Sequence, residues 1–324
     1  MYLYTSMIKV STCKNHIIKD IIPILHLSPQ QIRGLIMIKK LLGIAPTLNT
    51  DGSFNPSPLA LKLATSAKTD YKETAFQNPY QGPQSKIMMV CTEEKNLTMA
   101  NGKDFSTGNH PVEMLVPMLH FKNAGFDIDI FTPTGKSAKI EAWAMPAEDK
   151  NVMSLYDEYD EQFKNPKSLS EFANQLMDDS SEYIAIFIPG GHGAMNGLPE
   201  NQDLNKLIHW SFKKDLHMLA ICHGPAALLS ANLNNDGEFL YSGYSMAAFP
   251  DSMDKQTPMM GYMPGHLTYQ FGRKLSELGV SIINKKADKT CHHDRKLITG
   301  ASPQAANDFG ILSATELLKS QNTL

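Results

Sequence analysis

From about Lys86 onward, short apolar runs alternate with stretches of helical periodicity. Each run ends in polar or glycine-rich residues, which is typical of strands buried on both faces of a parallel sheet. The predicted strands are Lys86–Cys91, Phe126–Thr132, Tyr183–Pro189, His217–Cys222, Ser281–Lys285 and Lys296–Gly300, and the predicted helices are Pro111–Ala124, Asn201–Lys214, Pro225–Ala231, Gly265–Leu278 and Pro303–Leu318. The alternation predicts an α/β fold built on a doubly wound, mostly parallel sheet.

Two segments depart from this alternation. Residues 1–70 are weakly patterned, and we interpret them as an N-terminal extension, compatible with disorder, ahead of an α/β domain over residues 71–320. Residues 141–180 are more charged and helical than their surroundings and lie between two predicted strands. We expect this segment to form a small helical cap inserted into the main domain.

Composition and charge narrow the class of protein. Apolar residues make up 42% of the chain and charged residues 19%, which is ordinary for a soluble globular protein. Its 30 basic and 33 acidic residues are scattered without long blocks of one sign, so no binding groove for polymeric nucleic acid is expected. Charged residues also interrupt the apolar N-terminus before it reaches about 20 apolar residues, so we expect no membrane segment, no export and a cytoplasmic location.

One of the four cysteines stands at the end of a predicted strand. The four lie far apart without a CxxC pair, which favours reduced thiols. In the stretch LAICHGPAALL, Cys222 follows the apolar run and precedes a helix opened by Gly224 and Pro225, so the turn resembles a nucleophile elbow. A helix N-terminus and the adjacent His223 would both favour the thiolate. The alternative is a buried cysteine that acts only as a small apolar residue.

A pair of glycines follows another predicted strand. Gly190 and Gly191 leave backbone N–H groups free to approach a ligand or an oxyanion. A tight turn without a ligand fits the same residues, and His192 is equally compatible with an ordinary loop histidine. Together with the cysteine elbow, the pair is a candidate oxyanion hole.

Carboxylates at two further strand ends are candidate proton carriers. Glu113 falls in the first turn of the helix that begins at Pro111, where it acts either on the helix dipole or as a carboxyl beside the thiol. Asp251 and Asp254 can orient a histidine as the acid of a triad, or be solvated turn residues. Spacing does not choose between these alternatives.

Other motifs give no support for a cofactor. No Walker loop and no GxGxxG motif after a strand is present, so we expect no nucleotide cofactor. The run Cys291–Asp294 contains ligand-type residues, but we expect an exposed turn there and not a metal site.

Several ordered motifs carry a family resemblance. The stretches FSTGNHP, EAWAMP, FIPGGHGAMNGLPE, CHGPAALL, GYSMAAFPDSMDKQTP, GYMPGHLT and DRKLITGASPQAAN together resemble the HchA-type branch of the ThiJ/PfpI superfamily. The resemblance runs from about residue 80 to residue 318. It implies a flavodoxin-like α/β fold with an added cap, and a homodimer.

The resemblance also implies a chemistry. Members of this branch are described as glutathione-independent glyoxalases that convert methylglyoxal to lactate, as deglycases of early methylglyoxal or glyoxal adducts on proteins and nucleotides, and as holding chaperones for unfolding proteins. Position by position, the implied catalytic residues are Cys222, His223, Asp254 and Glu113, with the oxyanion donor at Gly190 and Gly191. The implied substrates are small dicarbonyls or glycated amines and thiols.

One part of the family's pattern is missing. A two-histidine, one-carboxylate metal site of this branch falls here on Lys122, Asp127 and Tyr159. Lysine and tyrosine are poor replacements for two neutral imidazoles, so we predict no zinc at that position.

Two other functions stay open on the residues alone. A cysteine aminopeptidase or amidase shares the thiol, histidine and acid, and differs in not needing Glu113. A holding chaperone would instead capture unfolding chains on apolar surface, and some of the 18 methionines lie in the run MDKQTPMMGYMPG.

Overall fold

The computed structural model describes residues 37, 39, 41–83, 86–176, 182–234 and 237–322. Within these ranges, none of the helices is both long enough and apolar enough to cross a bilayer. Part of the predicted extension, residues 1–36, therefore lies outside the described residues, and with it most of the segment for which disorder was expected.

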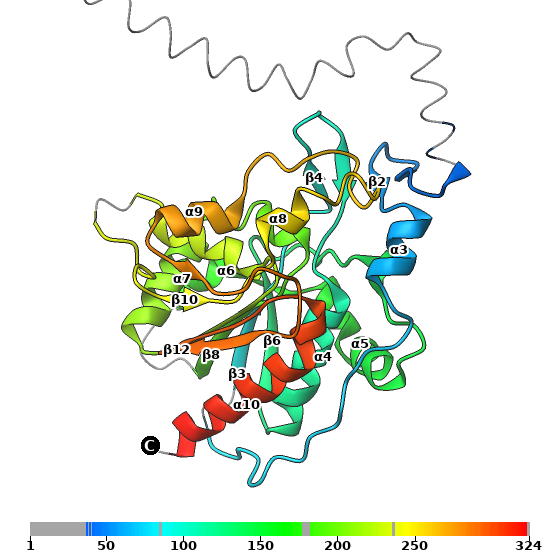
Figure 1. The fold of residues 1–324 in the computed structure, drawn as a ribbon. Helices are drawn as coiled ribbons and strands as arrows, with labels where there is room; N and C mark the ends of the chain where they lie inside the picture. Colours follow the sequence, from blue (N-terminus) through cyan, green and yellow to red (C-terminus); the bar gives the residue numbers. More distant parts are fainter. Residues whose placement is uncertain are drawn as a thin grey trace, which may run out of the picture.

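A seven-stranded sheet forms the centre of the molecule (Figure 1). Its strand order is β12-β13-β9-β8-β3-β6-β7, and every neighbouring pair is parallel except β12 and β13. The strands are β3 (Lys86–Val90), β6 (Asp127–Thr132), β7 (Lys167–Ser168), β8 (Tyr183–Ile188), β9 (His217–Ile221), β12 (Cys291–Asp294) and β13 (Leu297–Gly300). The predicted α/β class with a mostly parallel sheet is confirmed.

Helices cover both faces of this sheet, as Figure 1 shows for α4 and α10 on one side and α7 and α9 on the other. One face carries α4 (Pro111–Asn123), α5 (Lys150–Lys164) and α10 (Ala306–Asn322), and the other carries α7 (Gln202–Lys213), α9 (Phe271–Glu277) and the 3-10 helix η4 (Gly224–Asn232). Successive residues of β3 serve the two layers in turn, because side chains alternate along a strand. Ile87 and Met89 pack towards α4, whereas Met88 and Val90 pack towards η4.

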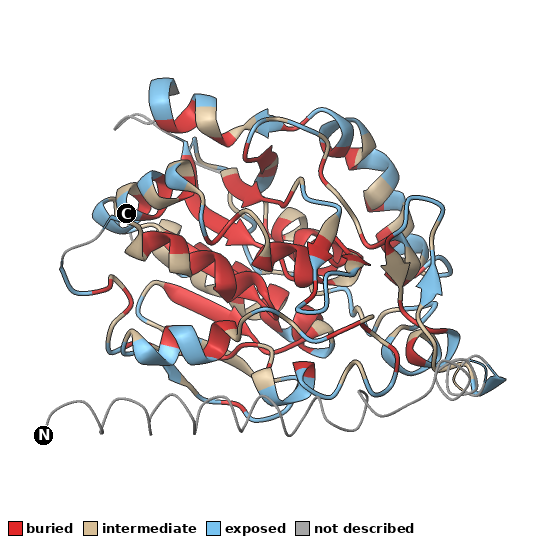
Figure 2. Cartoon of the chain, turned by 90° about the horizontal axis from the view of Figure 1, so that it is seen from above, coloured by how far each residue is buried: buried red, intermediate tan, exposed pale blue. Residues whose placement is uncertain are grey.

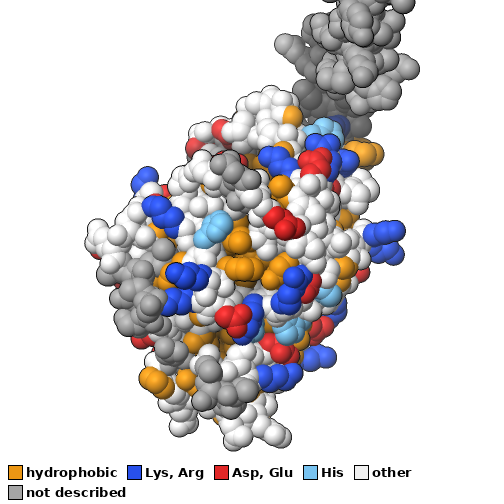
Figure 3. Space-filling view, turned by 90° about the vertical axis from the view of Figure 1, so that its left-hand side faces the viewer, with side chains coloured by type: hydrophobic (Ala, Val, Ile, Leu, Met, Phe, Trp, Pro, Cys, Tyr) orange, Lys and Arg blue, Asp and Glu red, His pale blue; other side chains and the backbone are white. Residues whose placement is uncertain are grey.

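Burial follows the same layers. Figure 2 shows buried residues in the central strands and on the helix sides that face them, with exposed residues at the outside. On the face drawn in Figure 3, basic and acidic side chains are interspersed around small apolar groups. The continuous apolar core explains why the strands read as unbroken hydrophobic runs.

Smaller elements surround one end of the sheet. A second sheet has the order β1-β2-β5-β4, and β10 pairs with β11 in a third. These elements are β1 (Thr47–Leu48), β2 (Phe54–Asn55), β4 (Asn96–Thr98), β5 (Asp104–Ser106), β10 (Ser245–Met246), β11 (Ser281–Ile282), α3 (Pro58–Ala64), α6 (Leu169–Glu171), α8 (Asp251–Asp254), η1 (Ala142–Ala144), the π-helix η2 (Phe172–Leu176), η3 (His192–Met195) and η5 (Pro303–Ala305).

One strand prediction and one turn prediction are wrong. The run Ser281–Lys285 was expected in the main sheet, but only its first two residues form β11, which pairs with β10 outside that sheet. The run Cys291–Asp294 was expected as an exposed turn, but it forms the edge strand β12 through a tight hairpin with β13, in which Arg295 has a φ of 57°. Its half-buried polar side chains suit a sheet edge, where they discourage pairing with other chains.

The segment 141–180, predicted as a cap, contributes to the main sheet and its packing. Helix α5 buries Val152, Leu155 and Phe163 in the same apolar layer as α4, and β7 pairs with β6. The described part of the extension includes α3, which begins after Ser57 because the Ser57 side chain caps Ala60 N–H. The division into extension, domain and cap stays a prediction.

A substitution at Gly310 tests the packing of α10 on α4. A Cβ at this position would lie 2.6 Å from Cδ2 of His120 and 3.0 Å from Cα of Pro117, so Gly310→Ala forces the two helices apart. We expect a loss of about 1–3 kcal/mol in the free energy of unfolding, measured by denaturant titration. Lys319→Ala, an exposed position on the same helix, should stay within about 0.5 kcal/mol of the wild type.

Candidate active site

Cys222 lies at a strained turn between β9 and η4. Its φ of 61° is in the left-handed region, which a non-glycine residue adopts only when the surrounding structure holds it there. Cys222 N–H donates to the carbonyl of Gly300 (2.8 Å), and the carbonyl of Cys222 accepts from Phe249 N–H (2.9 Å). Gly224 is needed in the same turn, because a Cβ there would lie 2.5 Å from the carbonyl oxygen of Ile188. The predicted elbow is thus present, followed by a 3-10 helix.

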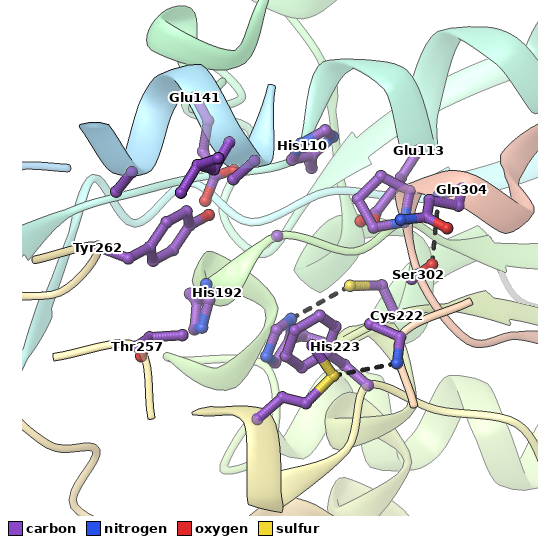
Figure 4. A pocket seen from close by; sticks show the side chains of 18 of the residues that line it. His110, Glu113, Glu141, His192, Cys222, His223, Thr257, Tyr262, Ser302 and Gln304 are labelled. Atoms are coloured by element: carbon purple, nitrogen blue, oxygen red, sulfur yellow. Dashed lines mark hydrogen bonds between the residues drawn. The ribbon is translucent and has the colours of Figure 1, made fainter. Parts of the chain in front are cut away.

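A chain of polar contacts leads from the thiol into the core, and Figure 4 shows its first link, between Cys222 and His223. Cys222 Sγ lies 3.3 Å from His223 Nδ1, and His223 Nε2 lies 3.0 Å from Asp254 Oδ2. Asp254 is buried at the end of α8, whereas Asp251 accepts from the backbone N–H groups of Gly272 and Arg273 at the start of α9. The structure therefore brings Asp254, and not Asp251, to the histidine.

Glu113 is packed against the cysteine. It lies fully buried in the first turn of α4 and faces the Cys222 thiol and the backbone N–H of Gly191, although neither carboxylate oxygen has a partner in good hydrogen-bond geometry among the described residues. Gly190 makes this proximity possible, because a Cβ there would lie 2.1 Å from Glu113 Oε2 and 2.7 Å from Cys222 Cβ. Four predicted side chains, Cys222, His223, Asp254 and Glu113, thus meet at one place.

The predicted oxyanion glycines line the same place. Gly190 accepts from the backbone N–H of His110 through its carbonyl (2.9 Å), and Gly191 borders the cavity with a φ of 98°. A side chain at Gly191 is excluded, because its Cβ would lie 2.4 Å from the carbonyl oxygen of Gly108. The two glycines are therefore required for the close approach of three loops, and the role of an oxyanion donor stays a prediction.

The electrostatics of the thiol differ from the sequence expectation. Burial raises the pKa of the Cys222 thiol well above its usual value, and the neighbouring Glu113 carboxyl raises it further. Burial also raises the pKa of Glu113 well above that of an ordinary glutamate. The expectation that a helix start and His223 favour the thiolate was wrong for the unliganded site, because burial among carboxyls opposes the charge.

The pKa values of His223 and His192 are shifted in opposite directions. Burial lowers the pKa of His223, with a further contribution from His192, so His223 is neutral and can accept a proton. For His192, burial acts downward, but the Asp254 carboxylate outweighs it and raises the pKa. Burial acts upward on Asp254, but the two histidines hold the pKa of this carboxyl far below its usual range.

Sequence reasoning missed several residues of the site. His192, which fitted an ordinary loop histidine, lies 3.1 Å from Asp254 Oδ1 through its Nε2, with its ring centroid 4.0 Å from that of His223. Glu141, His110 and Tyr262 also line the cavity. Glu141 and His110 belong to the motifs EAWAMP and FSTGNHP, and a polar residue within a recognised motif was the signal that could have found them.

The cavity above Cys222 has a volume of about 290 Å³. Ala60, Leu63 and Ala64 of α3 form part of its wall, together with Met253 and Met260. Helix α3 is tied to this wall by Ser57, whose N–H donates to Gly261 O (2.8 Å) and whose hydroxyl donates to Met260 O (3.1 Å). The N-terminal extension therefore contributes to the site.

The residues at the family's metal position do not fit a divalent cation. The Lys122 ammonium pairs with Glu158 and lies 5.5 Å from the centroid of the Tyr159 ring. A cation placed there would meet a positive charge in place of an imidazole. Elsewhere, His192, His223 and Asp254 have ligand atoms within 4.8 Å of one another, but these atoms already bond to each other.

Comparisons with known proteins agree with this geometry. The model of the DJ-1/PfpI family matches residues 105–239. The protein/nucleic acid deglycase HchA of Escherichia coli O157:H7 is 46% identical over 268 residues, which cover 83% of this chain and 93% of the relative.

Two solved structures are also similar. Glyoxalase III from Candida albicans is 25% identical with a TM-score of 0.56, covering 71% of this chain and 97% of that one. Rapid Encystment Protein 24 kDa from Francisella tularensis is 25% identical with a TM-score of 0.59, covering 72% and 99%.

The raised pKa of Glu113 predicts a pH-dependent cost in stability. A glutamate whose folded pKa is raised holds its proton more tightly in the folded state, so stability falls as pH rises from about 4.5 towards that pKa. Glu113→Gln should therefore raise the free energy of unfolding by about 1–3 kcal/mol at pH 8 and by little at pH 4, measured by denaturant titration. Glu93→Gln is the matched control for the change from glutamate to glutamine, because Glu93 is half-buried outside the cavity and bonds Thr134.

The residues around Asp127 predict no zinc binding there. Wild type and Asp127→Asn, both dialysed against zinc, should carry the same amount of zinc per chain by elemental analysis, because Lys122 repels the cation. A loss of one zinc per chain in Asp127→Asn would contradict this prediction.

Proposed function

The chain belongs to the DJ-1/PfpI family, and we propose that it is a cysteine-dependent, glutathione-independent glyoxalase and deglycase. The proposed reactions are the conversion of methylglyoxal to lactate and the removal of early methylglyoxal or glyoxal adducts from proteins and nucleotides. The 46% identical relative is a protein/nucleic acid deglycase, and the Candida albicans structure is a glyoxalase III.

The pairing of Cys222 with Glu113 carries this proposal. A hydrolase needs a thiol, a base and an acid, but it does not need a second buried carboxyl beside the nucleophile. Here Glu113 is enclosed against the Cys222 thiol, with Gly190 kept free of a side chain to accommodate it. Such a carboxyl has the position and the raised pKa of a group that carries protons between carbon atoms.

The first step forms a bond between sulfur and the aldehyde carbon. Neutral His223 takes the thiol proton through Nδ1, and Asp254 at its Nε2 stabilises the imidazolium that results. The Cys222 thiolate then adds to the aldehyde, the carbon–oxygen double bond opens, and the new oxyanion takes the proton of Glu113, which leaves a carboxylate beside the new carbon–sulfur bond. In this proposal backbone N–H groups near Gly191 hold that oxygen, and the product is a hemithioacetal.

The second step moves a proton between two carbons. The Glu113 carboxylate removes the proton from the hemithioacetal carbon while the ketone oxygen takes a proton from the His223 imidazolium, giving an enediol. Glu113 then returns its proton to the neighbouring carbon as the hydroxyl on the first carbon gives its proton to His223. The former aldehyde carbon is thereby oxidised to a thioester while the former ketone carbon is reduced to an alcohol. Water then cleaves the thioester, releasing lactate and the free thiol, so no external thiol is consumed.

An early adduct enters the same sequence. In an aminocarbinol the former aldehyde carbon carries a hydroxyl and an amine, and attack by sulfur forms the carbon–sulfur bond as the carbon–nitrogen bond breaks. The departing amine takes a proton, which leaves the same hemithioacetal. Free dicarbonyl and adduct thus converge on one intermediate.

The main rival function is a cysteine aminopeptidase or amidase of the same superfamily. It uses Cys222, His223 and Asp254 in the same way, but peptide hydrolysis should tolerate Glu113→Gln. The enclosure of Glu113 against Cys222 favours the isomerising chemistry.

We also propose a homodimer located in the cytoplasm, with holding-chaperone activity in stress. Support for the chaperone comes from apolar side chains that remain exposed near the cavity mouth, among them Met259, Met260 and Leu63. Holding activity that survives Cys222→Ser would show that it is separate from the thiol chemistry.

Lactate formation is the direct test of the proposed function. Wild type should form lactate from methylglyoxal without glutathione, and Cys222→Ser and Glu113→Gln should each lower kcat/KM by at least about 100-fold, because they remove the nucleophile and the proton carrier. Glu93→Gln should retain wild-type activity. A well-folded wild type that forms no lactate, or a Glu113→Gln variant that forms it normally, would contradict the proposal.

A further inference from the structure

A second polar group lies in the cavity and has no part in the steps above. Figure 4 shows Glu141 and Tyr262 on one side of the cavity, away from Cys222 and Glu113, with His110 between the two sides. Glu141 precedes η1 and His110 precedes α4, and the two loops are joined because Glu141 N–H donates to the carbonyl of Asn109 (3.0 Å). Backbone bonds therefore hold this group on the side of the cavity away from Cys222.

Two atoms of this group lack partners. Glu141 Oε1 accepts from the Thr107 hydroxyl (2.6 Å) and the carboxyl also faces the backbone N–H of His192, but Oε2 is buried without a partner in good hydrogen-bond geometry among the described residues. His110 Nδ1 is also buried and has no hydrogen bond among the described residues. Buried polar atoms without partners are uncommon and destabilising, so a pair of them lining one cavity points to a ligand that completes them.

The charges of Glu141 and His110 indicate which chemical groups a ligand at this place would carry. Burial raises the pKa of Glu141 to about 7, so near neutral pH this carboxyl exists both as the acid and as the anion, and a cationic amine favours the anion. Burial lowers the pKa of His110 to about 3, which keeps its imidazole neutral. A carboxylate beside a neutral imidazole accepts hydrogen bonds from an amine or hydroxyl and repels a second carboxylate.

The size of the cavity fits a ligand larger than a dicarbonyl. Methylglyoxal has five non-hydrogen atoms, whereas the cavity of about 290 Å³ has room for several molecules of water at about 30 Å³ each. The wall towards solvent is apolar, formed by Leu63, Met253 and Met260, all partly exposed. An apolar mouth above a carboxylate suits an alkyl chain that ends in an amine, as in the side chain of lysine.

We propose that Glu141, with His110 and Tyr262, is a subsite for the amine-bearing part of a glycated adduct, whose carbinol carbon lies against Cys222. This inference rests on the proposed function and narrows its substrate class. In this arrangement Glu141 and His110 accept hydrogen bonds from the amine and the carbinol hydroxyl, and the apolar mouth covers the methylene chain. The subsite makes adducts of alkyl amines better ligands than compounds of the same size without the amine.

Calorimetry with a stable analogue tests the subsite without turnover. The probe is a lysine derivative with a 2-hydroxypropyl group on the side-chain nitrogen, and the comparison compound has an ether oxygen in place of that nitrogen. Wild type should bind the amino alcohol at least ten times more tightly than the ether. Glu141→Gln, which keeps an acceptor for Thr107, should weaken amino-alcohol binding about ten-fold and leave the ether unaffected.

Two further variants test whether a loss of binding comes from the subsite itself and not from misfolding or from any change of glutamate to glutamine. Glu93→Gln alters a similar glutamate–threonine pair outside the cavity and should bind both compounds as wild type does. Tyr262→Phe removes only a hydroxyl and should weaken amino-alcohol binding several-fold. Equal binding of the two compounds by wild type, or full binding by both Glu141→Gln and Tyr262→Phe, would overturn the subsite.

Lactate formation measured on the same preparations separates the two proposals. Lactate from free methylglyoxal without any preference for the amino alcohol contradicts the subsite alone. Preference for the amino alcohol with no lactate contradicts the proposed function alone.

Discussion

The active site depends on the burial of a thiol and a carboxyl side by side against the backbone at Gly190. Cys222 and Glu113 come from different elements and meet over Gly190, where no side chain can be accommodated. Their burial withholds water from both groups, which disfavours charge on either and makes the site reactive only when a proton is transferred. The left-handed backbone at Cys222 and the paired glycines follow from the need to bring these groups together.

Much of this arrangement could be predicted from the sequence, because the carboxyl ends of parallel strands meet at one edge of a sheet. Cys222 and the Gly190–Gly191 pair follow apolar runs that read clearly as strands, and Glu113 falls at a helix start marked by Pro111. For the acid of the triad, the candidates were narrowed to Asp251 and Asp254, which lie in one short segment. Short sequence patterns were enough to predict a functional residue wherever that residue lies next to a strand or a helix.

What could not be predicted depends on contacts between distant segments. The edge strand β12 is polar and short, so it becomes a strand only through its partner β13. His192 is held in the site by its contact with Asp254, which lies 62 residues away in the chain. Glu141 is held by a backbone hydrogen bond to the loop before α4. The direction of the thiol pKa was misjudged because the helix start was visible in the sequence, whereas the surrounding carboxyls and the depth of burial were not.

The tie between Ser57 and the Met260–Gly261 turn affects the order in which the protein assembles. These partners are 203 residues apart, so closing the contact requires a long loop, whose entropy opposes early formation. Until this contact forms, the cavity lacks part of its outer wall. We therefore expect the mouth of the site to be the last part of the site to fold and the first to open, so that the nucleophile exists before its pocket is complete.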